Sequence, residues 1–597
     1  MQSLGALFKE TVTRYPKKTA ILFKQNGRYI PQNWEDLSKR VYSAAAYFMK
    51  LGVEPGDRIA ILSENRPEWA VVDLAALMVG AMTVPIYTSL SPAEISYILK
   101  DCGAKALAVS NRILFEKIIP IQKDLPELKT VIAFEPAVAV SSEDLKISLV
   151  YLHEMEKEAV STTLEERLKT ISADASASII YTSGTTGPPK GVVLTHGNFI
   201  HNVTESGSVL NMGPTDIHLS FLPLSHVFER MAGHYLMIKI GAIIAYAESM
   251  DTVPQNLLEV RPTFIVGVPR FFEKIQARVL EQVEKAGSLR RALFFWAKDI
   301  GRRKRLLVQD KKRPGPRLAL QLFLARKLVY SKFRKRLGGR IRFCVAGGAP
   351  LSREIAEFFY DLGVMIFEGY GLTETSPVIA ANREGRFKFG TVGIPLNGIE
   401  VALTPEGEII TKSPSVMKGY YHKPAETEAV LKDGWFYTGD LGSIDKEGYL
   451  SITGRKKELI VTSGGKKVAP RAIEELIESD PVVLRCVLFG EGKKFITAFI
   501  VADKEKLLEM ANGQKIAYKD YAALIADSRV YKILETRIAE LSKNLANYEK
   551  IKYFALLEND FSQAAGELTP TLKVKREVIC QRYKDKLLPF YEKAQSE

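Results

Sequence analysis

The chain has 597 residues and a formal net charge of +14; 46% of its residues are hydrophobic and 25% are charged. This length predicts a large domain plus at least one smaller one, and the composition is typical of a globular protein with large cores. A membrane-spanning helix is not expected, because no run of about 20 apolar residues occurs. The N-terminal residues lack the apolar stretch of a signal peptide, so the expected location is cytoplasmic.

The four cysteines lie far apart, with no CxxC pair and no Cys/His cluster. This pattern argues against a zinc site and a disulfide framework and predicts four unpaired, mostly buried thiols. The residues are Cys102, Cys344, Cys486 and Cys580.

The positive charge is confined to one segment. Residues 290–342 contain 19 Lys+Arg and 2 Asp+Glu, whereas the rest of the chain has 64 basic and 67 acidic residues. The basic character is therefore a local patch and does not describe the whole protein.

Taken in chain order, the first part alternates helical patterns with short apolar runs, which predicts an α/β fold with layered sheets. Pro92 and Gly103 bracket a helix, and strands are expected at 178–182, 264–267 and 341–346. Near residue 455 the pattern changes to a short α+β unit that includes a long polar helical stretch at about 515–545. We expect a large N-terminal domain (1–454), a hinge (455–458) and a small mobile α+β C-terminal domain (459–597).

The clearest chemical motif is the segment from Tyr181 to Gly191, YTSGTTGPPKG. Its glycines allow close approach of the backbone, and its hydroxyls and lysine suit a polyphosphate. It differs from a Walker A loop, and strand patterns on both sides predict a hairpin loop. An ordinary glycine-rich turn is the alternative. The candidate polyphosphate-binding residues are Thr182, Ser183, Gly184, Thr185, Thr186, Gly187 and Lys190.

A second motif, FEGYGLTET, runs from Phe367 to Thr375. A tyrosine between two glycines can lay its ring against a purine, and a hydroxyl followed by a carboxylate suits a phosphate oxygen and its Mg²⁺. Upstream, the segment VAGGAP (Val345–Pro350) ends a predicted strand with two glycines, where a base could lie against backbone that carries no side chain. The candidates are Gly348, Ala349, Pro350, Glu368, Gly369, Tyr370, Gly371, Thr373 and Glu374.

The third motif, DGWFYTGDLG, runs from Asp433 to Gly442 and precedes GYLSITGRKKELI. An aspartate just after a Thr-Gly turn, here Asp440, can accept both hydroxyls of a ribose. A purely structural hairpin would fit the same spacing.

These three segments, in this order, resemble the superfamily of acyl-CoA synthetases, luciferases and peptide-synthetase adenylation domains, most closely the long-chain fatty acid–CoA ligases. The resemblance covers about residues 5–585. It implies that ATP activates a carboxylic acid as acyl-AMP, with Mg²⁺, and that a thiol then takes the acyl group.

The resemblance also implies residue roles. Tyr370 would stack on adenine, Thr373 contact phosphate, Glu374 bind Mg²⁺, and Asp440 and Arg455 hold the nucleotide. Lys457 would be the hinge, His226 the gate beside the carboxylate, and Ser463, Gly464, Gly465 and Lys466 would line the coenzyme A channel. For His226, a core histidine is the alternative.

The last signature segment, GELTPTLKVKR, implies a lysine that bridges the carboxylate and the α-phosphate. The common form ends in Gly-Lys, whereas Leu572 replaces that glycine here. Lys573 is the predicted residue and Lys575 the second candidate.

A long-chain acid is favoured by the expanded basic segment and the enlarged C-terminal domain. Within the basic segment, Leu318, Leu322, Ala325, Val329 and Phe333 fall at helical spacing. Two interpretations stay open: peripheral contact with an anionic membrane through 290–342, or a helix packed on its own core with a solvated basic face.

The expected thiol is coenzyme A, since no carrier domain follows the final lysine motif. A medium-chain or aryl acid, or a separate carrier protein as acceptor, remains the alternative. No nucleic-acid binding is expected, because the basic patch has few interleaved aromatic residues and no recognition motif.

Overall fold

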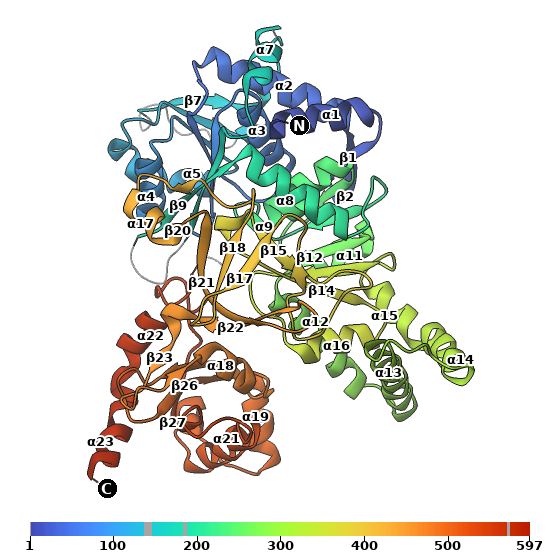
Figure 1. Cartoon of the computed structure of the whole chain (residues 1–597), viewed down its shortest axis with the longest axis vertical. Helices are drawn as coiled ribbons and strands as arrows, with labels where there is room; N and C mark the ends of the chain where they lie inside the picture. The colour runs from blue at the N-terminus through green and yellow to red at the C-terminus, as the bar shows by residue number, and fades with distance from the viewer. Residues whose placement is uncertain (1, 137–145, 161, 183–187, 570–572, 597) are drawn as a thin grey trace.

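The computed structural model describes residues 2–136, 146–160, 162–182, 188–569 and 573–596 (Figure 1). In Figure 1 the C-terminal part, in orange and red, lies below the larger part of the molecule, as a smaller unit. No helix in these described ranges is long and apolar enough to cross a membrane.

Two large sheets dominate the N-terminal part. The nine-stranded sheet has the order β16 (Ile394–Pro395), β15 (Val378–Ala381), β14 (Met365–Gly371), β13 (Phe343–Ala346), β12 (Phe264–Gly267), β10 (Ile217–Ser220), β11 (Ile243–Tyr246), β1 (Thr19–Gln25) and β2 (Arg28–Asn33). The eight-stranded sheet has the order β19 (Gly419–Tyr420), β9 (Lys190–Thr195), β8 (Ser176–Thr182), β4 (Met82–Ile86), β3 (Arg58–Leu62), β5 (Ala106–Val109), β6 (Thr130–Ala133) and β7 (Ser148–Tyr151).

Helix α3 (Pro67–Met78) is buried at every residue except Glu68 and belongs to the main hydrophobic core. A helix that is apolar on nearly all sides is stable only when protein surrounds it. Its one charged core residue, Asp73, pairs with the buried Arg230 at 2.5 Å. Arg230 also donates to Ser178 Oγ of β8 at 2.6 Å, so these buried groups tie α3 and η3 (Arg230–Tyr235) to the eight-stranded sheet.

The predicted helix around residue 95 is confirmed as α4 (Pro92–Cys102). Ser91 and Glu94 form a capping box, Pro92 occupies the first turn, and Gly103 ends the helix at a φ of 59°. A left-handed residue at this place is the usual helix terminator, and glycine adopts it without strain.

A third sheet contains β17 (Glu400–Leu403), β18 (Glu408–Lys412), β20 (Leu431–Lys432), β21 (Trp435–Ile444) and β22 (Leu450–Arg455). Beyond it, β25 (Val483–Phe489), β26 (Ile496–Ala502) and β27 (Ile551–Leu557) form the C-terminal sheet, packed with α18 (Pro470–Glu478) and α21 (Ser528–Leu541) around a core of its own. The fold class predicted from the sequence, layered α/β sheets plus a small α+β unit, is confirmed.

Some local predictions need correction. The helix expected at about 515–545 is two helices, α20 (Tyr521–Ile525) and α21, because Asp520 and Asp527 each cap a new helix start. The four cysteines are unpaired; three are buried and Cys580 is half-buried.

Candidate functional site

Four parallel strands of the nine-stranded sheet, β10, β12, β13 and β14, end at the same edge. In such sheets, ligands bind outside the carboxyl ends of the strands. Ala346 at the end of β13 lies opposite Glu368 of β14. The structure therefore brings two predicted groups together: Gly348, Ala349 and Pro350 after β13, and Glu368, Gly369, Tyr370 and Gly371 in β14.

Glu368 is buried, and its Oε1 accepts a hydrogen bond from the amide of Leu351 at 3.0 Å. Burial, assisted by the negative charge of Glu475 on α18, raises the pKa of Glu368 to about 8. This carboxyl is therefore mostly protonated at neutral pH and can donate a hydrogen bond there.

Tyr370, Asp440 and Arg455 form one group, joined by a hydrogen bond and an ion pair. The Tyr370 hydroxyl donates to Asp440 Oδ2 at 2.7 Å, and Arg455 Nε lies 2.8 Å from Asp440 Oδ1. Asp440 in β21 and Arg455 at the end of β22 are direct cross-strand partners. The antiparallel register thus fixes two predicted nucleotide-binding residues next to the predicted adenine-stacking tyrosine.

Glu374 lies in the short η5 helix (Thr373–Thr375), beside Thr373. Its Oε1 accepts a hydrogen bond from the hydroxyl of Tyr420 at 2.9 Å, and burial raises the pKa of Glu374. The hydrogen bond from Tyr420 and the positive charge of Arg455 oppose that rise.

The predicted phosphate segment is a hairpin, as expected: β8 pairs antiparallel with β9, and Thr182 lies opposite Lys190. Its tip, Ser183, Gly184, Thr185, Thr186 and Gly187, lies outside the described residues. The base of the hairpin is held by two tyrosines. Tyr181 donates to Asp101 at 2.5 Å, and Tyr97 donates to the carbonyl of Pro189 at 3.1 Å.

Lys190 makes two contacts with the β19 region. Its ammonium is 3.0 Å from Glu426 Oε2 and 5.0 Å from the centre of the Tyr420 ring. Tyr420 therefore contacts both Lys190 and Glu374, and it links the phosphate hairpin to the predicted metal ligand.

Lys573 is an exposed residue, and desolvation by the neighbouring protein lowers the pKa of its ammonium. Arg455 lowers the pKa further, whereas Asp440, Glu458 and Glu374 act in the opposite direction. The C-terminal lysine thus lies within electrostatic range of residues from three other segments. Lys575 instead caps the start of α22 (Arg576–Tyr583), and its amide donates to the carbonyl of Glu567.

His226 follows β10 and caps the short helix α9 (Val227–Glu229), its Nδ1 accepting from the amide of Phe228 at 3.2 Å. Burial and the positive charge of Lys573 lower the pKa of His226 to about 4. The ring is therefore neutral at physiological pH and lies near the C-terminal lysine.

With this geometry established, the chain can be compared with known proteins. The family model described as "AMP-binding enzyme" matches residues 8–421, and "AMP-binding enzyme C-terminal domain" matches residues 457–595. The chain belongs to the AMP-binding enzyme family. The resemblance inferred from the three motifs is confirmed.

Relatives of this AMP-binding enzyme match it over nearly its full length. A long-chain-fatty-acid–CoA ligase of Gallus gallus is 32% identical over 99% of this chain and 81% of its own. A long-chain-fatty-acid–CoA ligase of Mycobacterium tuberculosis is 33% identical over 95% of this chain and 94% of its own.

Solved structures share the fold. An anthranilate CoA ligase in complex with anthranoyl-AMP has a TM-score of 0.72 at 19% identity, covering 98% of this chain and 97% of that one. ATP-bound MatB from Rhodopseudomonas palustris has a TM-score of 0.67 at 24% identity, covering 98% and 99%.

Two sets of predicted residues of this AMP-binding enzyme lie in exposed turns. Lys457 is exposed within η6 (Lys456–Glu458), where Lys456 pairs with Glu408 at 2.8 Å. Ser463, Gly464, Gly465 and Lys466 form the exposed turn between β23 (Ile460–Val461) and β24 (Lys467–Val468). Within the described part of the chain, this turn makes no hydrogen bond with the group around Asp440.

Tyr420 and Glu426 were missed by the sequence interpretation. They lie in GYYHKPAET, which has no glycine-rich or charged pattern that singles it out. Only the pairing of β19 with β9 carries Tyr420 to the phosphate hairpin.

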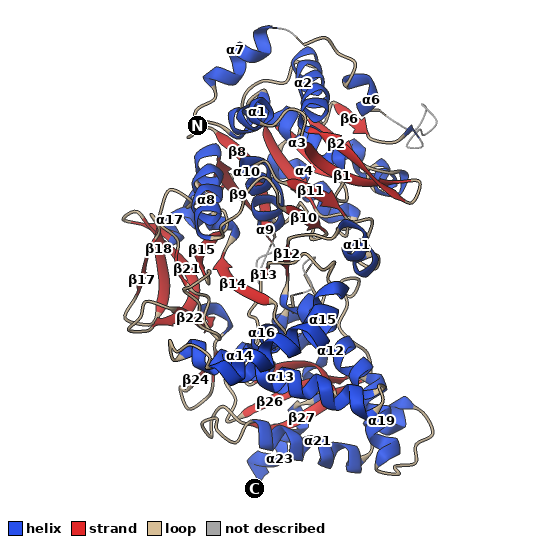
Figure 2. Ribbon diagram, turned by 90° about the vertical axis from the view of Figure 1, so that its right-hand side faces the viewer, coloured by secondary structure: helices blue, strands red, loops and turns tan. Residues whose placement is uncertain are grey.

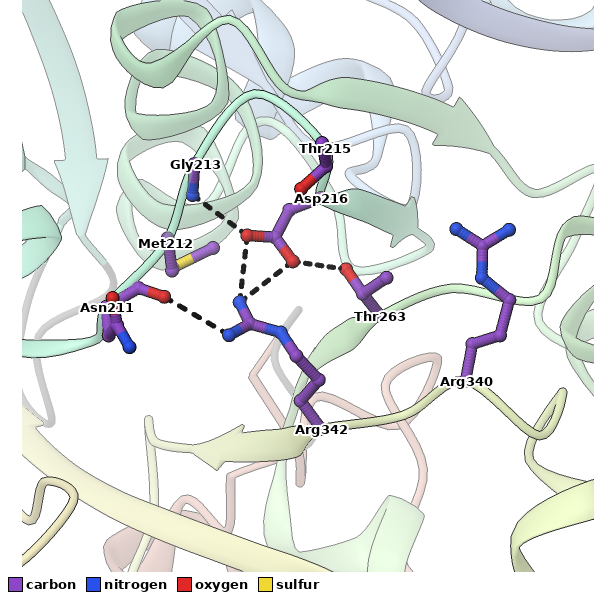
Figure 3. Close-up of a pocket in the computed structure, with 8 residues that line it drawn as sticks. All are labelled: Asn211, Met212, Gly213, Thr215, Asp216, Thr263, Arg340 and Arg342. Carbon is purple, nitrogen blue, oxygen red and sulfur yellow. Dashed lines mark hydrogen bonds and ion pairs between the residues drawn. The ribbon is translucent and has the colours of Figure 1, made fainter.

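A separate open cavity of about 460 Å³ lies at the opposite, amino-terminal edge of β10, β12 and β13 (Figure 3). Its central carboxylate, Asp216, is satisfied by Arg342 at 2.8 Å, by Thr263 Oγ1 at 2.6 Å and by the amide of Gly213 at 2.9 Å. This cavity is therefore distinct from the edge that gathers the predicted nucleotide residues.

Proposed function

We propose that this AMP-binding enzyme is a long-chain fatty acid–CoA ligase. It converts a fatty acid and ATP into acyl-AMP and pyrophosphate, then transfers the acyl group to coenzyme A and releases AMP. The observation that carries the proposal is the contact of Asp440 with both Tyr370 and Arg455, which joins the second and third predicted nucleotide motifs. The full-length similarity to long-chain-fatty-acid–CoA ligases supports the choice of acid and thiol.

In the first step a carboxylate oxygen bonds to the α-phosphorus while the bond to the bridging oxygen breaks, and pyrophosphate leaves. Nucleophile and phosphates are both negative, so the site must supply positive charge. We assign to Lys573 the neutralisation of the carboxylate and the α-phosphate, and to Lys190 that of the leaving phosphates. Lys573 is preferred over Lys575 because it ends the sequence LTPTLK, which resembles the form of this segment in long-chain ligases.

Nucleotide binding is assigned to the edge of the nine-stranded sheet. The ring of Tyr370 would stack on adenine beside Gly348, Ala349 and Pro350, and Asp440 would accept the ribose hydroxyls. In the structure the Asp440 carboxylate accepts a hydrogen bond from Tyr370 and pairs with Arg455. Its oxygens are therefore already directed toward hydrogen-bond donors at this edge.

The residues present fit one Mg²⁺ ion. Glu374 offers a single carboxylate, and the described residues hold no cluster of three His, Cys, Asp or Glu side chains that could bind a metal alone. Mg²⁺ commonly uses one or two carboxylates together with substrate phosphates and water. When bound, Mg²⁺ supplies charge neutralisation on the phosphate oxygens.

In the second step the thiol sulfur bonds to the acyl carbonyl carbon and AMP leaves. Lys573 is not needed here, which suits a swing of the C-terminal domain about Lys457. That swing would bring the turn at Ser463–Lys466 toward the site as the thiol entrance. Conformational steps of this kind can limit turnover.

The acceptor is tested by incubating the enzyme with ATP, Mg²⁺ and palmitate, with and without coenzyme A. We expect palmitoyl-CoA and AMP in equal amounts, formed only with coenzyme A present. Palmitoyl-AMP that accumulates while coenzyme A stays unacylated would contradict the assignment and favour a carrier protein as acceptor.

A further inference from the structure

The basic segment forms a helical projection on the side of the large domain, visible at the right of Figure 1 and facing the viewer in Figure 2. It consists of α13 (Ser288–Gln309), α14 (Pro316–Ala325), η4 (Arg326–Tyr330) and α15 (Ser331–Arg336). We call these residues, 288–336, the basic projection.

The inner face of the basic projection is firmly packed. Arg305 on α13 pairs with Asp361 of α16 (Arg353–Asp361) at 2.8 Å, both side chains being buried. Gly301 lies so close to α16 that a Cβ there would meet the carbonyl oxygen of Asp361 at 1.9 Å. The Tyr330 hydroxyl donates to the carbonyl of Ala297 at 2.7 Å and ties η4 to α13.

The apolar stripe predicted from helical spacing belongs to this inner face. Ala325 and Phe333 are buried, and Leu318, Leu322 and Val329 pack against the main core. The stripe itself therefore lies against the core of the protein, and membrane contact through this segment would use other side chains.

The outer face carries a second apolar set that the core does not use. Seven of the eighteen large apolar side chains exposed in the described residues fall within 289–328: Leu289, Phe295, Leu306, Leu320, Phe323, Leu324 and Leu328. Leu289 is 81%, Leu320 62% and Phe323 61% exposed. Leu320, Leu324 and Leu328 recur every four residues, so they line one side of the helix, opposite Leu318 and Leu322.

Unpaired cations lie on the same helical segments as this apolar set. Arg317, Arg326 and Lys327 are exposed, and no carboxylate of the described residues lies within ion-pairing distance of them. Other cations of the projection, such as Arg303 and Lys311, do have acidic partners. An apolar surface flanked by unpaired lysine and arginine matches the boundary between the acyl chains and the anionic headgroups of a bilayer.

We infer that the outer face of the basic projection is a docking surface for a lipid bilayer that carries anionic headgroups. Its exposed apolar side chains insert among the acyl chains, and Arg317, Arg326 and Lys327 contact the phosphates. The packed inner face keeps the projection rigid, so little ordering is required on binding. Only the purpose of docking rests on the proposed function: a docked ligase would have access to fatty acids dissolved in the bilayer.

Binding is tested without substrates, by flotation of the full chain with vesicles of phosphatidylcholine alone or with 30% phosphatidylglycerol as the probe. We expect binding to the anionic vesicles that weakens with salt, and weak binding to phosphatidylcholine. Arg317→Gln with Lys327→Gln should lower the partition coefficient about 25-fold, and Phe323→Ser about tenfold.

Matched controls lie on other faces. Lys169→Gln with Lys519→Gln removes two exposed cations, and Ile113→Ser on α5 (Arg112–Glu116) removes a side chain that is 73% exposed. These variants should bind as the unmodified chain does. Equal binding to both vesicle types, or equal losses in the control variants, would overturn the inference.

Two further measurements separate this inference from its alternatives. Binding of short nucleic acid that is as tight as vesicle binding and lost in the same variants would make the surface a nucleic-acid site instead. Activity with a detergent-dispersed fatty acid should be unchanged in the projection variants. If the unmodified chain shows no activity with the dispersed fatty acid, the proposed function is contradicted. The vesicle-binding result would not be affected.

Discussion

Lys190 of the phosphate hairpin pairs with Glu426 at 3.0 Å, while its ammonium lies over the ring of Tyr420. Tyr420 in turn donates to Glu374. The Glu426 carboxylate and a triphosphate would compete for the same ammonium. If Lys190 binds the nucleotide as we propose, Glu426 would set how readily Lys190 turns to it.

Replacing Glu426 with Gln should strengthen ATP binding. Both side chains are partly exposed, and such ion pairs contribute about 0–1 kcal/mol, so we expect the Kd for ATP to fall about two- to fivefold. The affinity for the fatty acid should not change. Isothermal titration with ATP measures this, and Glu428→Gln, on the same helix, is the matched control. A weaker affinity for ATP in Glu426→Gln would show that the carboxylate assists the nucleotide.

Replacing Lys573 with Ala should slow acyl-AMP formation about 100-fold or more, since it removes the charge placed at the reacting carboxylate. Thioester formation from supplied acyl-AMP should persist. Pyrophosphate exchange measures the first step, and acyl-CoA release from synthetic acyl-AMP measures the second. Lys575→Ala should change either rate no more than about twofold. Equal losses in both half-reactions of Lys573→Ala would contradict the role.

For Tyr370, the ring and the hydroxyl make separable predictions. Tyr370→Phe keeps the ring and frees Asp440 Oδ2 for the ribose, so the Kd for ATP should stay within about threefold. Tyr370→Ala also removes the stacking surface and should raise the Kd about tenfold. Fluorescence titration with a labelled ATP compares the two. Similar Kd values for the two variants would exclude adenine stacking.

His226 should not titrate in the physiological range. Its pKa is lowered to about 4 by burial and by Lys573, below the value of about 6.5 for an exposed histidine. Its neutral form is therefore the native one above about pH 5, and folding loses stability as pH falls below 6.5, where the unfolded chain takes up a proton. The ratio of adenylation rates between the unmodified chain and His226→Gln should stay constant from pH 5.5 to 8. A stepwise change in that ratio near pH 6.5 would show an exposed, titrating imidazole.

The sequence predicted features that depend on local patterns. Pro92 and Gly103 marked the ends of α4, and the strand patterns around the phosphate segment predicted the hairpin of β8 and β9. The spacing of Leu318, Leu322 and Ala325 predicted a helix but not its orientation, because periodicity shows a stripe without showing what covers it.

Features that depend on long-range pairing were not predictable. Tyr420 reaches Lys190 only because β19 adds to the edge of β9, more than 200 residues earlier in the chain. The second apolar stripe of the basic projection was hidden for a related reason. Leu320, Phe323 and Leu324 are ordinary residues in the sequence, and only their exposure distinguishes them.

The central claim is that the carboxylate of a fatty acid attacks the α-phosphorus of ATP. Palmitate labelled with ¹⁸O in its carboxyl group tests it directly, by mass spectrometry of the products after turnover with ATP and coenzyme A. The account predicts AMP that carries one ¹⁸O atom, palmitoyl-CoA that keeps the other ¹⁸O atom in its carbonyl group, and unlabelled pyrophosphate. Formation of ADP with ¹⁸O in inorganic phosphate would contradict it. So would a rate that is highest with acetate or benzoate when acids from C2 to C20 replace palmitate.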